Sequence, residues 1–297
     1  MKRLKVNLIY LILLSMVYSC SFSQNREQLA KKYSYISDYG EDQGIIMVGN
    51  KVNVNGEKES RYGYIDLDGK EIVPLKYESA GNFFEGKGGV KFQEKWGFIN
   101  KEGKEVVPFK YDYSGHFANG LASVQLNGKS GFVNDIGQEV VPLKYDHVFD
   151  FDAVGVAQVG TIIGVNGNLN INKYGLINKK GEEIVPIKYD DIGIFYDDNT
   201  PAVAVITTNG KSGLIDNTGK IIIALKYDNI EVYYGLQKAN LFKVRLGTKE
   251  GLVNIKGEEI TKIIYDYVED LNEGEIGVSE KGNKYFIGVS GKRINGH

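Results

Sequence analysis

The feature that most constrains the fold of this chain is a repeated pattern of two glycines followed by a tyrosine–acid dipeptide. The dipeptide occurs six times, from Tyr77-Glu78 to Tyr265-Asp266, at spacings of 34, 34, 44, 38 and 38 residues. One glycine stands fourteen residues before each tyrosine and another stands eight residues before it. Because these positions keep the same register in every copy, the pattern predicts tandem copies of one structural unit.

Two further positions belong to this unit. A lysine precedes the tyrosine in the first five copies, and a proline stands five residues after the second glycine in the first four. The tyrosines are Tyr77, Tyr111, Tyr145, Tyr189, Tyr227 and Tyr265, and the first glycines are Gly63, Gly97, Gly131, Gly175, Gly213 and Gly251. Such short units cannot bury their own faces, so we expect neighbouring copies to stack.

Each copy contains several short β-prone runs. Phe98-Ile99 leads to a turn at the second glycine, and a further strand, Glu105 to Val107, is expected to end at Pro108 because proline cannot donate to a sheet. After the tyrosine–acid dipeptide comes the apolar run Leu121 to Val124, and Asn127-Gly128 then predicts a hairpin turn. The sequence therefore predicts an all-β protein, a tandem repeat of antiparallel meanders with three or four short strands each.

The two ends of the chain resemble parts of the unit. We assign residues 24–60 to a linker and half repeat, 61–281 to six repeats, and 282–297 to a second half repeat. Six units and two complementary halves favour a propeller-like ring of about seven units, in which the terminal halves complete one unit and leave no exposed edge strands. An open β-solenoid or superhelical stack of hairpins is the alternative, since the units are short for propeller blades.

The clearest copy contains Lys95-Trp96-Gly97-Phe98-Ile99-Asn100 and resembles the WG-repeat family, also called KWG repeats. The resemblance covers roughly residues 35–294. Other copies keep the glycine and replace the tryptophan, with Tyr62, Ser130, Tyr174, Ser212 and Glu250 at that position. The resemblance implies a bacterial repeat domain without a defined ligand, and it implies no particular chemistry.

Residues 1–23 are predicted to be an export signal. Basic residues precede an apolar run from Val6 to Tyr18, whose 13 residues are too few to cross about 30 Å of hydrocarbon as a helix. Cys20 stands where a bacterial lipobox places the cysteine that receives lipid, and small residues also permit ordinary cleavage near Ser23. We favour a lipoprotein of the outer membrane or periplasm, with a periplasmic or secreted protein as the alternative.

Charge and cysteine content restrict the classes of partner. The formal net charge is -2, and loss of Lys2, Arg3 and Lys5 with the signal takes it to -5. A weakly acidic chain without a basic stripe argues against binding nucleic acid. Cys20 is the single cysteine, so no disulfide forms within the chain.

The sequence carries no motif for catalysis or metal binding. The three histidines, His116, His147 and His297, have no ligand spacing, and no nucleophile elbow or phosphate-binding loop occurs. Asp66-Leu67-Asp68-Gly69 begins like a calcium loop but lacks its other ligands. We therefore expect no enzyme activity, no catalytic residue, no metal site and no cofactor; a hydrolase with unrecognised paired carboxylates is the least favoured alternative.

The regions that differ between copies are the candidates for contact with a partner. We interpret Lys-Tyr-Asp as structural, with the tyrosine packed between neighbouring units, its hydroxyl hydrogen-bonded, and the aspartate capping the following turn. Repeat proteins bind mainly through what varies between units, here residues 161–172, 195–201 and 233–240. The candidate partner contacts are Tyr196, Asn199, Tyr233 and Tyr234.

These observations together predict an extracytoplasmic binding or scaffold protein of the bacterial cell envelope. Its partner would be a protein or a glycan, and it would touch the membrane only through a lipid on Cys20. The alternative is a purely structural envelope repeat protein that has no small ligand.

Overall fold

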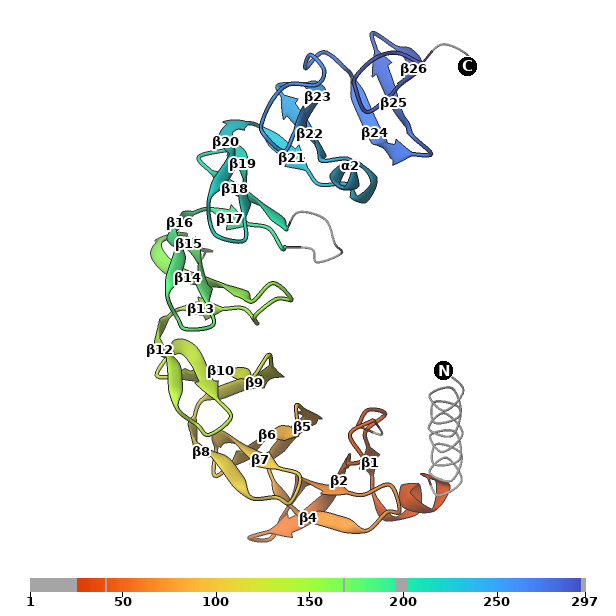
Figure 1. Cartoon of the computed structure of the whole chain (residues 1–297). Coiled ribbons are helices and arrows are strands. Elements are labelled where there is room, and N and C mark those ends of the chain that lie inside the picture. Colours follow the sequence, from red (N-terminus) through yellow and green to blue (C-terminus); the bar gives the residue numbers. More distant parts are fainter. Residues whose placement is uncertain (1–25, 41, 168, 196–201, 295–297) are drawn as a thin grey trace, which may run out of the picture. The chain divides into compact units, whose positions relative to one another are not determined.

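The chain forms seven small antiparallel sheets (Figure 1), as seen in a computed structural model that describes residues 26–40, 42–167, 169–195 and 202–294. In every sheet, consecutive strands lie side by side, in the orders β1-β2-β3-β4, β5-β6-β7-β8, β9-β10-β11-β12, β13-β14-β15-β16, β17-β18-β19-β20, β21-β22-β23 and β24-β25-β26. The predicted all-β tandem repeat of three- and four-stranded meanders, about seven in number, is confirmed.

The chain divides into two compact units, residues 1–144 and 145–297. The strands of the first are β1 (Tyr35–Ile36), β2 (Ile46–Val54), β3 (Glu57–Ile65), β4 (Glu71–Tyr77), β5 (Ser79–Phe84), β6 (Lys87–Phe92), β7 (Lys95–Asn100), β8 (Glu105–Tyr111), β9 (Tyr113–Ala118), β10 (Leu121–Leu126), β11 (Lys129–Asn134) and β12 (Glu139–Tyr145), whose last residue begins the second unit. Residues 26–32 are helical, and Leu29 and Tyr33 pack on Ile46 and Val48 of β2.

The second unit contains one short helix among its strands. Its elements are β13 (His147–Val148), β14 (Val156–Asn166), β15 (Leu169–Asn178), β16 (Glu183–Tyr189), β17 (Asp191–Ile192), β18 (Val203–Thr208), β19 (Lys211–Asp216), β20 (Ile221–Tyr227), β21 (Asn229–Glu231), α2 (Tyr234–Lys238), β22 (Leu241–Leu246), β23 (Lys249–Asn254), β24 (Tyr267–Asn272), β25 (Glu275–Glu280) and β26 (Asn283–Ile287). In the described part of the chain, no helix has the length and apolar character needed to cross a membrane.

The hairpin turns follow the sequence pattern. Asn127 and Gly128, with φ of 52° and 74°, join β10 to β11, and Asn209 and Gly210, with φ of 51° and 68°, join β18 to β19. Two consecutive residues with positive φ form the type I′ turn, whose twist matches that of the strands. The predicted hairpins at both Asn-Gly dipeptides are therefore confirmed.

The fourth strand explains why the first glycine and the proline occur together. Trp96 pairs with Tyr111 and Phe98 pairs with Val107, so Gly97 alone lies opposite the three residues between Val107 and Tyr111. This bulge brings β8 so close that a Cβ on Gly97 would lie 2.6 Å from the Val107 carbonyl oxygen. The equivalent distance at the first five of these glycines is 2.4–2.6 Å, so any side chain there would displace the fourth strand. At Gly251, in a three-stranded sheet, the Cβ would lie 2.9 Å from the Lys262 carbonyl oxygen.

The prediction that Pro108 ends its strand is wrong. Strand β8 continues through Pro108 to Tyr111. It lies at the edge of its sheet, where proline is tolerated because no neighbouring strand needs its missing N–H.

The core lies between successive sheets within each unit. Phe98, Val107 and Tyr111 of one sheet pack against Phe117 and Val124 of the next. In the second unit, Leu214, Ile223 and Tyr227 pack in the same way against Phe242 and Val244. The six repeat tyrosines are only 0–6% exposed. Packing between neighbouring copies is confirmed for Tyr77, Tyr111, Tyr189 and Tyr227, whose clusters join two sheets within one unit.

Each terminal half pairs with the repeat nearest to it in the sequence. Strands β1 and β2 pair with β3 and β4 of the first repeat, whereas β26 pairs with β25 of the last. Each half pairs with its neighbour in sequence because every sheet after the first begins directly after a tyrosine–acid dipeptide. Residues before the first dipeptide therefore belong to the first sheet, and residues after the last dipeptide belong to the last sheet.

Candidate functional site

The Tyr-Asp dipeptide ties each sheet to the next. One carboxylate oxygen of Asp112 lies 2.5 Å from Lys95 Nζ, and the other accepts the N–H of Asn127 at 2.7 Å. Asp228 accepts in the same way from Lys211 Nζ and the N–H of Gly247, each at 2.6 Å. Asp190 and Asp266 repeat the arrangement. The prediction that the aspartate caps the following turn is confirmed.

The lysine before the tyrosine also has a structural role. Lys76, Lys110, Lys188 and Lys226 lie 4.9–5.3 Å from the ring centroid of the adjacent tyrosine, a cation–π geometry. The prediction that the tyrosine hydroxyls are hydrogen-bonded is wrong for Tyr111 and Tyr227, which make no such bond to the described residues. Packing against the neighbouring sheet, rather than hydroxyl bonding, accounts for these tyrosines.

The copies differ most in the connection between the first and second strands of each sheet. This connection is a tight turn at Glu85-Gly86, Asn119-Gly120 and Glu273-Gly274. It is longer at residues 37–45, 149–155, 193–202 and 232–240. Because the repeated positions are used in packing, these long connections are the surface on which repeats can acquire different functions.

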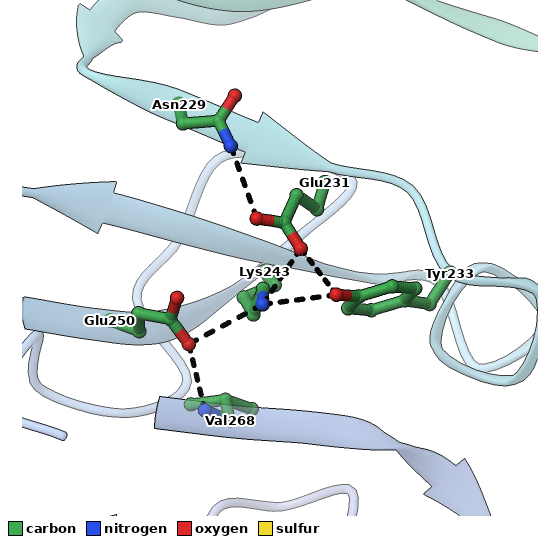
Figure 2. Close-up of polar contacts among 6 residues, drawn as sticks. All are labelled: Asn229, Glu231, Tyr233, Lys243, Glu250 and Val268. Carbon is green, nitrogen blue, oxygen red and sulfur yellow. Dashed lines mark hydrogen bonds and ion pairs between the residues drawn. The ribbon is translucent and has the colours of Figure 1, made fainter. Parts of the chain in front are cut away.

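The connection at residues 232–240 contacts a buried ionic cluster through Tyr233 (Figure 2). Lys243 of β22 is 8% exposed, and its Nζ lies 2.7 Å from Glu231 and 3.4 Å from Glu250. The hydroxyl of Tyr233 bonds to Glu231 and lies 3.1 Å from Lys243 Nζ, whereas Glu250 also accepts the N–H of Val268 on β24. The cluster therefore links three strands of one sheet to the first strand of the next.

The charges in this cluster stabilise one another. Burial by itself would raise the pKa of Glu231, but hydrogen bonds from Lys243 and Tyr233 outweigh burial and hold that pKa below its ordinary value. Burial would likewise lower the pKa of Lys243, yet its bonds to Glu231 and Tyr233 raise it. A lysine that stays protonated cannot act as a nucleophile, so the cluster serves to hold structure.

A further carboxylate, that of Asp270, fixes the start of the helix in this connection. Asp270 on β24 accepts the N–H groups of Gly235 and Leu236 at 3.1 and 2.8 Å, at the start of α2. The ring of Tyr234 is 58% exposed, and Lys238 Nζ lies 4.1 Å from its centroid. Tyr234 is therefore presented to solvent on a short helix whose N-terminal end is anchored by Tyr233 and Asp270.

The predicted contact residues fall into three groups. Tyr234 is exposed, whereas Tyr233 turns inward and bonds to the Lys243 cluster. Tyr196, Asn199 and the predicted lipidation residue Cys20 lie outside the described residues. The structure thus brings Tyr233 and Tyr234 to one connection but gives them different surroundings.

Two cavities open beside these long connections. In the first unit, a cavity of about 510 Å³ lies between the 37–45 connection and the tight β5–β6 turn. Its lining is Asp38, Tyr39, Gly40, Asp42, Gln43, Asn82, Phe83, Phe84 and Glu85. In the second unit, Phe149, Gln158 and Ile194 help to line a cavity of about 220 Å³ between the β13–β16 and β17–β20 sheets.

The sequence reasoning missed Tyr39 and Phe84. Tyr39 lies before the first tyrosine–acid dipeptide, in the N-terminal half repeat and outside the six whole copies. Aligning Tyr35-Ile36 with the first strands of later copies would have revealed the long connection that follows. Phe84 belongs to the regular strand β5. It lines a cavity only because the 37–45 connection of the preceding sheet is long.

The acidic segment singled out as a possible calcium loop is a turn. Asp66 accepts the N–H groups of Asp68 and Lys70 at 3.1 and 2.8 Å. Across the described residues, no three histidine, cysteine or acidic side chains gather as a metal site.

The stacked meanders and their variable connections define a repeat scaffold, a class of protein that binds through its surface. The sequence profile of the WG containing repeat matches residues 62–96, 96–129, 131–160, 174–211, 213–236 and 251–285. The chain therefore belongs to the WG-repeat family, as its motifs predicted. No curated protein matches it.

Several solved structures are similar at low sequence identity. Hsv2p of Kluyveromyces lactis is 7% identical, with a TM-score of 0.36 over 84% of this chain and 92% of that one. AztD of Citrobacter koseri is 12% identical, with a TM-score of 0.33 over 85% and 80%. A eukaryotic initiation factor is 9% identical, with a TM-score of 0.37 over 88% and 86%. Likenesses at this level carry no argument about function.

Proposed function

We propose that this chain is a binding module of the bacterial cell envelope that recruits a protein or a glycan through its first-to-second-strand connections. The observation that carries the proposal is the 510 Å³ cavity beside the 37–45 connection, which has two exposed aromatic rings in its lining. Binding sites are typically concave, with aromatic walls and a few polar groups, in this range of volume. The exposed Tyr234 on its anchored helix supports the same surface in the second unit.

A binding role is preferred to catalysis. The buried Lys243 cluster has its charges paired, and the carboxylates Asp112, Asp190, Asp228 and Asp266 are used to join sheets. The hydrolase alternative would be revived by turnover of a glycan that is lost when one pair of acids is replaced.

The binding proposal is tested with the purified chain on an array of bacterial envelope glycans and with identified envelope proteins. We expect capture that is lost in Tyr39→Ala and Phe84→Ala and kept in Tyr113→Ala, an exposed tyrosine of the first unit outside the cavity. Substitution of Tyr234 and of the original candidates Tyr196 and Asn199 by alanine extends the test to the second unit. Failure of every folded preparation to bind would favour the purely structural alternative.

The location in the envelope is part of the same proposal. The basic and apolar residues before Cys20 support export, and Cys20 supports lipid attachment. We expect the wild-type chain to incorporate radiolabelled palmitate and to fractionate with membranes, and Cys20→Ala to lose both. An unlabelled protein released into the periplasm would instead point to cleavage near Ser23.

A further inference from the structure

We propose that the cavity between the 37–45 connection and the β5–β6 turn binds a sugar that carries a free amino group. This inference rests on the proposed function, because it names the ligand class for the same surface. It follows from the preformed walls of the cavity, its aromatic rings, and a lining whose described residues are rich in acceptors and include no cationic side chain.

The walls of the cavity are fixed before any ligand arrives. Ser37 Oγ donates to Asn82 Oδ1 at 3.0 Å, and the hydroxyl of Tyr64 donates to the carbonyl of Gly81 at 2.6 Å, so both bonds join the first two sheets. Gly40 has φ of 110°, and a Cβ there would lie 2.3 Å from the Ile45 carbonyl oxygen. These contacts restrain the described residues on both sides of the cavity, which reduces the entropy lost on binding.

The aromatic rings offer a surface suited to a sugar ring and to a cation. Tyr39 is 72% exposed and Phe84 is 44% exposed, and the ring of Phe84 lies 4.6 Å from the ring of His116 on β9. An aromatic face packs well against apolar C–H groups and attracts a nearby ammonium group through its ring electrons.

The polar groups of the lining are mainly acceptors. Asp38 is paired with Arg26, and both oxygens of Glu85 accept backbone N–H groups, from Asn119 and Gly120, at 2.8 Å. Asp42 accepts one hydrogen bond, from Gln43 Nε2 at 3.1 Å. Because a carboxylate has about four lone-pair sites, Asp42 retains capacity for a ligand donor.

The charge of the lining favours a cationic ligand. Among the described residues of the lining, three are carboxylates and none is a lysine, arginine or histidine. Lys101 and Lys87 lie nearby, and their ammonium groups donate to the backbone carbonyls of Gln43 and Glu85, at 2.5 and 3.1 Å. An anionic sugar would meet Asp42 and Glu85 unfavourably, whereas an ammonium group gains a charge-assisted hydrogen bond.

The volume sets the size of the ligand. A cavity of about 510 Å³ is far larger than a lone ammonium ion and lies in the range that holds molecules of several rings. An amino sugar of two or three residues therefore matches the space, the aromatic walls and the acceptors together.

The test is calorimetric titration of the full chain, purified in detergent, with a trimer of β-1,4-linked glucosamine and with the same trimer fully N-acetylated. We expect the glucosamine trimer to bind at least about tenfold more tightly, since acetylation removes the charge that Asp42 recognises. Binding should also weaken as the salt concentration rises. Equal affinity for the two trimers, or no binding of the glucosamine trimer, would overturn the proposal.

Matched variants separate the cavity from the rest of the surface. Asp42→Asn should weaken binding of the glucosamine trimer about tenfold, whereas Glu102→Gln, in the exposed β7–β8 turn, should leave it unchanged. Tyr39→Ala should weaken both trimers and Tyr113→Ala neither. Unchanged circular dichroism and melting temperature will show that each variant is folded.

The outcomes distinguish this inference from the proposed function. If the acetylated trimer binds as tightly, and Tyr39→Ala but not Asp42→Asn reduces its affinity, the amino-sugar assignment is wrong while the binding surface stands. If no glycan or envelope protein binds any folded preparation, both proposals fail.

Discussion

At the residue scale, single positions decide how closely strands and sheets approach. The first glycine of each copy lies under the bulge of the fourth strand, and the second, with φ of 76–85°, forms the turn between the third and fourth strands. The third residue of the second strand is buried but differs between sheets: it is Gly89 in β6, Ser123 in β10 and Lys243 in β22. A lysine at this position is tolerated because Glu231 and Glu250 pair with it.

Replacing Gly97 by alanine should destabilise the first unit. The added Cβ would lie 2.6 Å from the Val107 carbonyl oxygen, so β8 would have to shift, at a cost of about 1–3 kcal/mol. Chemical denaturation of both variants measures the change. Gly288→Ala is the matched control, because no atom lies within 4 Å of its Cβ, and an equal loss there would contradict the explanation.

Replacing Lys243 by methionine should be strongly destabilising. It leaves Glu231 and Glu250 close together without their cation, and breaking a buried pair costs about 3–5 kcal/mol. The same substitution in a Glu231→Gln, Glu250→Gln background should cost much less. Equal losses of unfolding free energy in the two backgrounds would show that the methylene chain of the lysine matters rather than its charge.

At the element scale, the Tyr-Asp dipeptide acts as a clasp between a strand of one sheet and a hairpin of the next. Hydrogen bonds from the paired lysine hold the pKa of Asp112, Asp190, Asp228 and Asp266 below the ordinary value of 3.8. Because the folded pKa is lowered, the stability that these carboxylates contribute is present above pH 3.8 and is lost as the pH falls through the folded pKa.

Asp228→Asn tests this clasp. We expect a lower melting temperature at pH 7, and a smaller difference from wild type as the pH falls below 3.8, where the native carboxylate also becomes neutral. Lys211→Met should have a smaller effect, because Asp228 still accepts the N–H of Gly247. Melting curves from pH 7 to pH 2 provide the measurement, and a constant difference across that range would argue against the clasp.

At the scale of the whole molecule, stacking of sheets supplies the core within each compact unit. Apolar faces of neighbouring meanders pack on each other, as Phe98 does on Phe117 and Leu214 on Phe242. The propeller-like ring and the open stack remain alternative predictions from the sequence, and they differ in how far the chain extends.

Small-angle scattering on residues 24–297 separates the two. A closed ring predicts a radius of gyration near roughly 19 Å, the globular expectation for this length. An open stack predicts a clearly larger value and a rod-like profile. Measurement at several protein concentrations controls for association, which would also enlarge the apparent radius.

The sequence by itself determined the repeat, the strand-rich class, the Asn-Gly hairpins and the structural use of the Tyr-Asp dipeptide. Each of these depends on local chemistry that recurs at fixed spacing: positive φ at Asn-Gly, a carboxylate that caps a turn, and a β-prone run beside a glycine. Local preferences of this kind are visible in one copy and are reinforced by the other five.

Only the tertiary structure decided how these parts are used. Pro108 stays within a strand because β8 is an edge strand, and the terminal halves join their nearest repeats because of where the sheet boundary falls. Tyr233 and Tyr234 are adjacent, yet one is bound to Lys243 and the other faces solvent. The cavity beside Tyr39 and Phe84 arises from a long connection meeting a short one across two sheets, a relation between distant residues that no local pattern encodes.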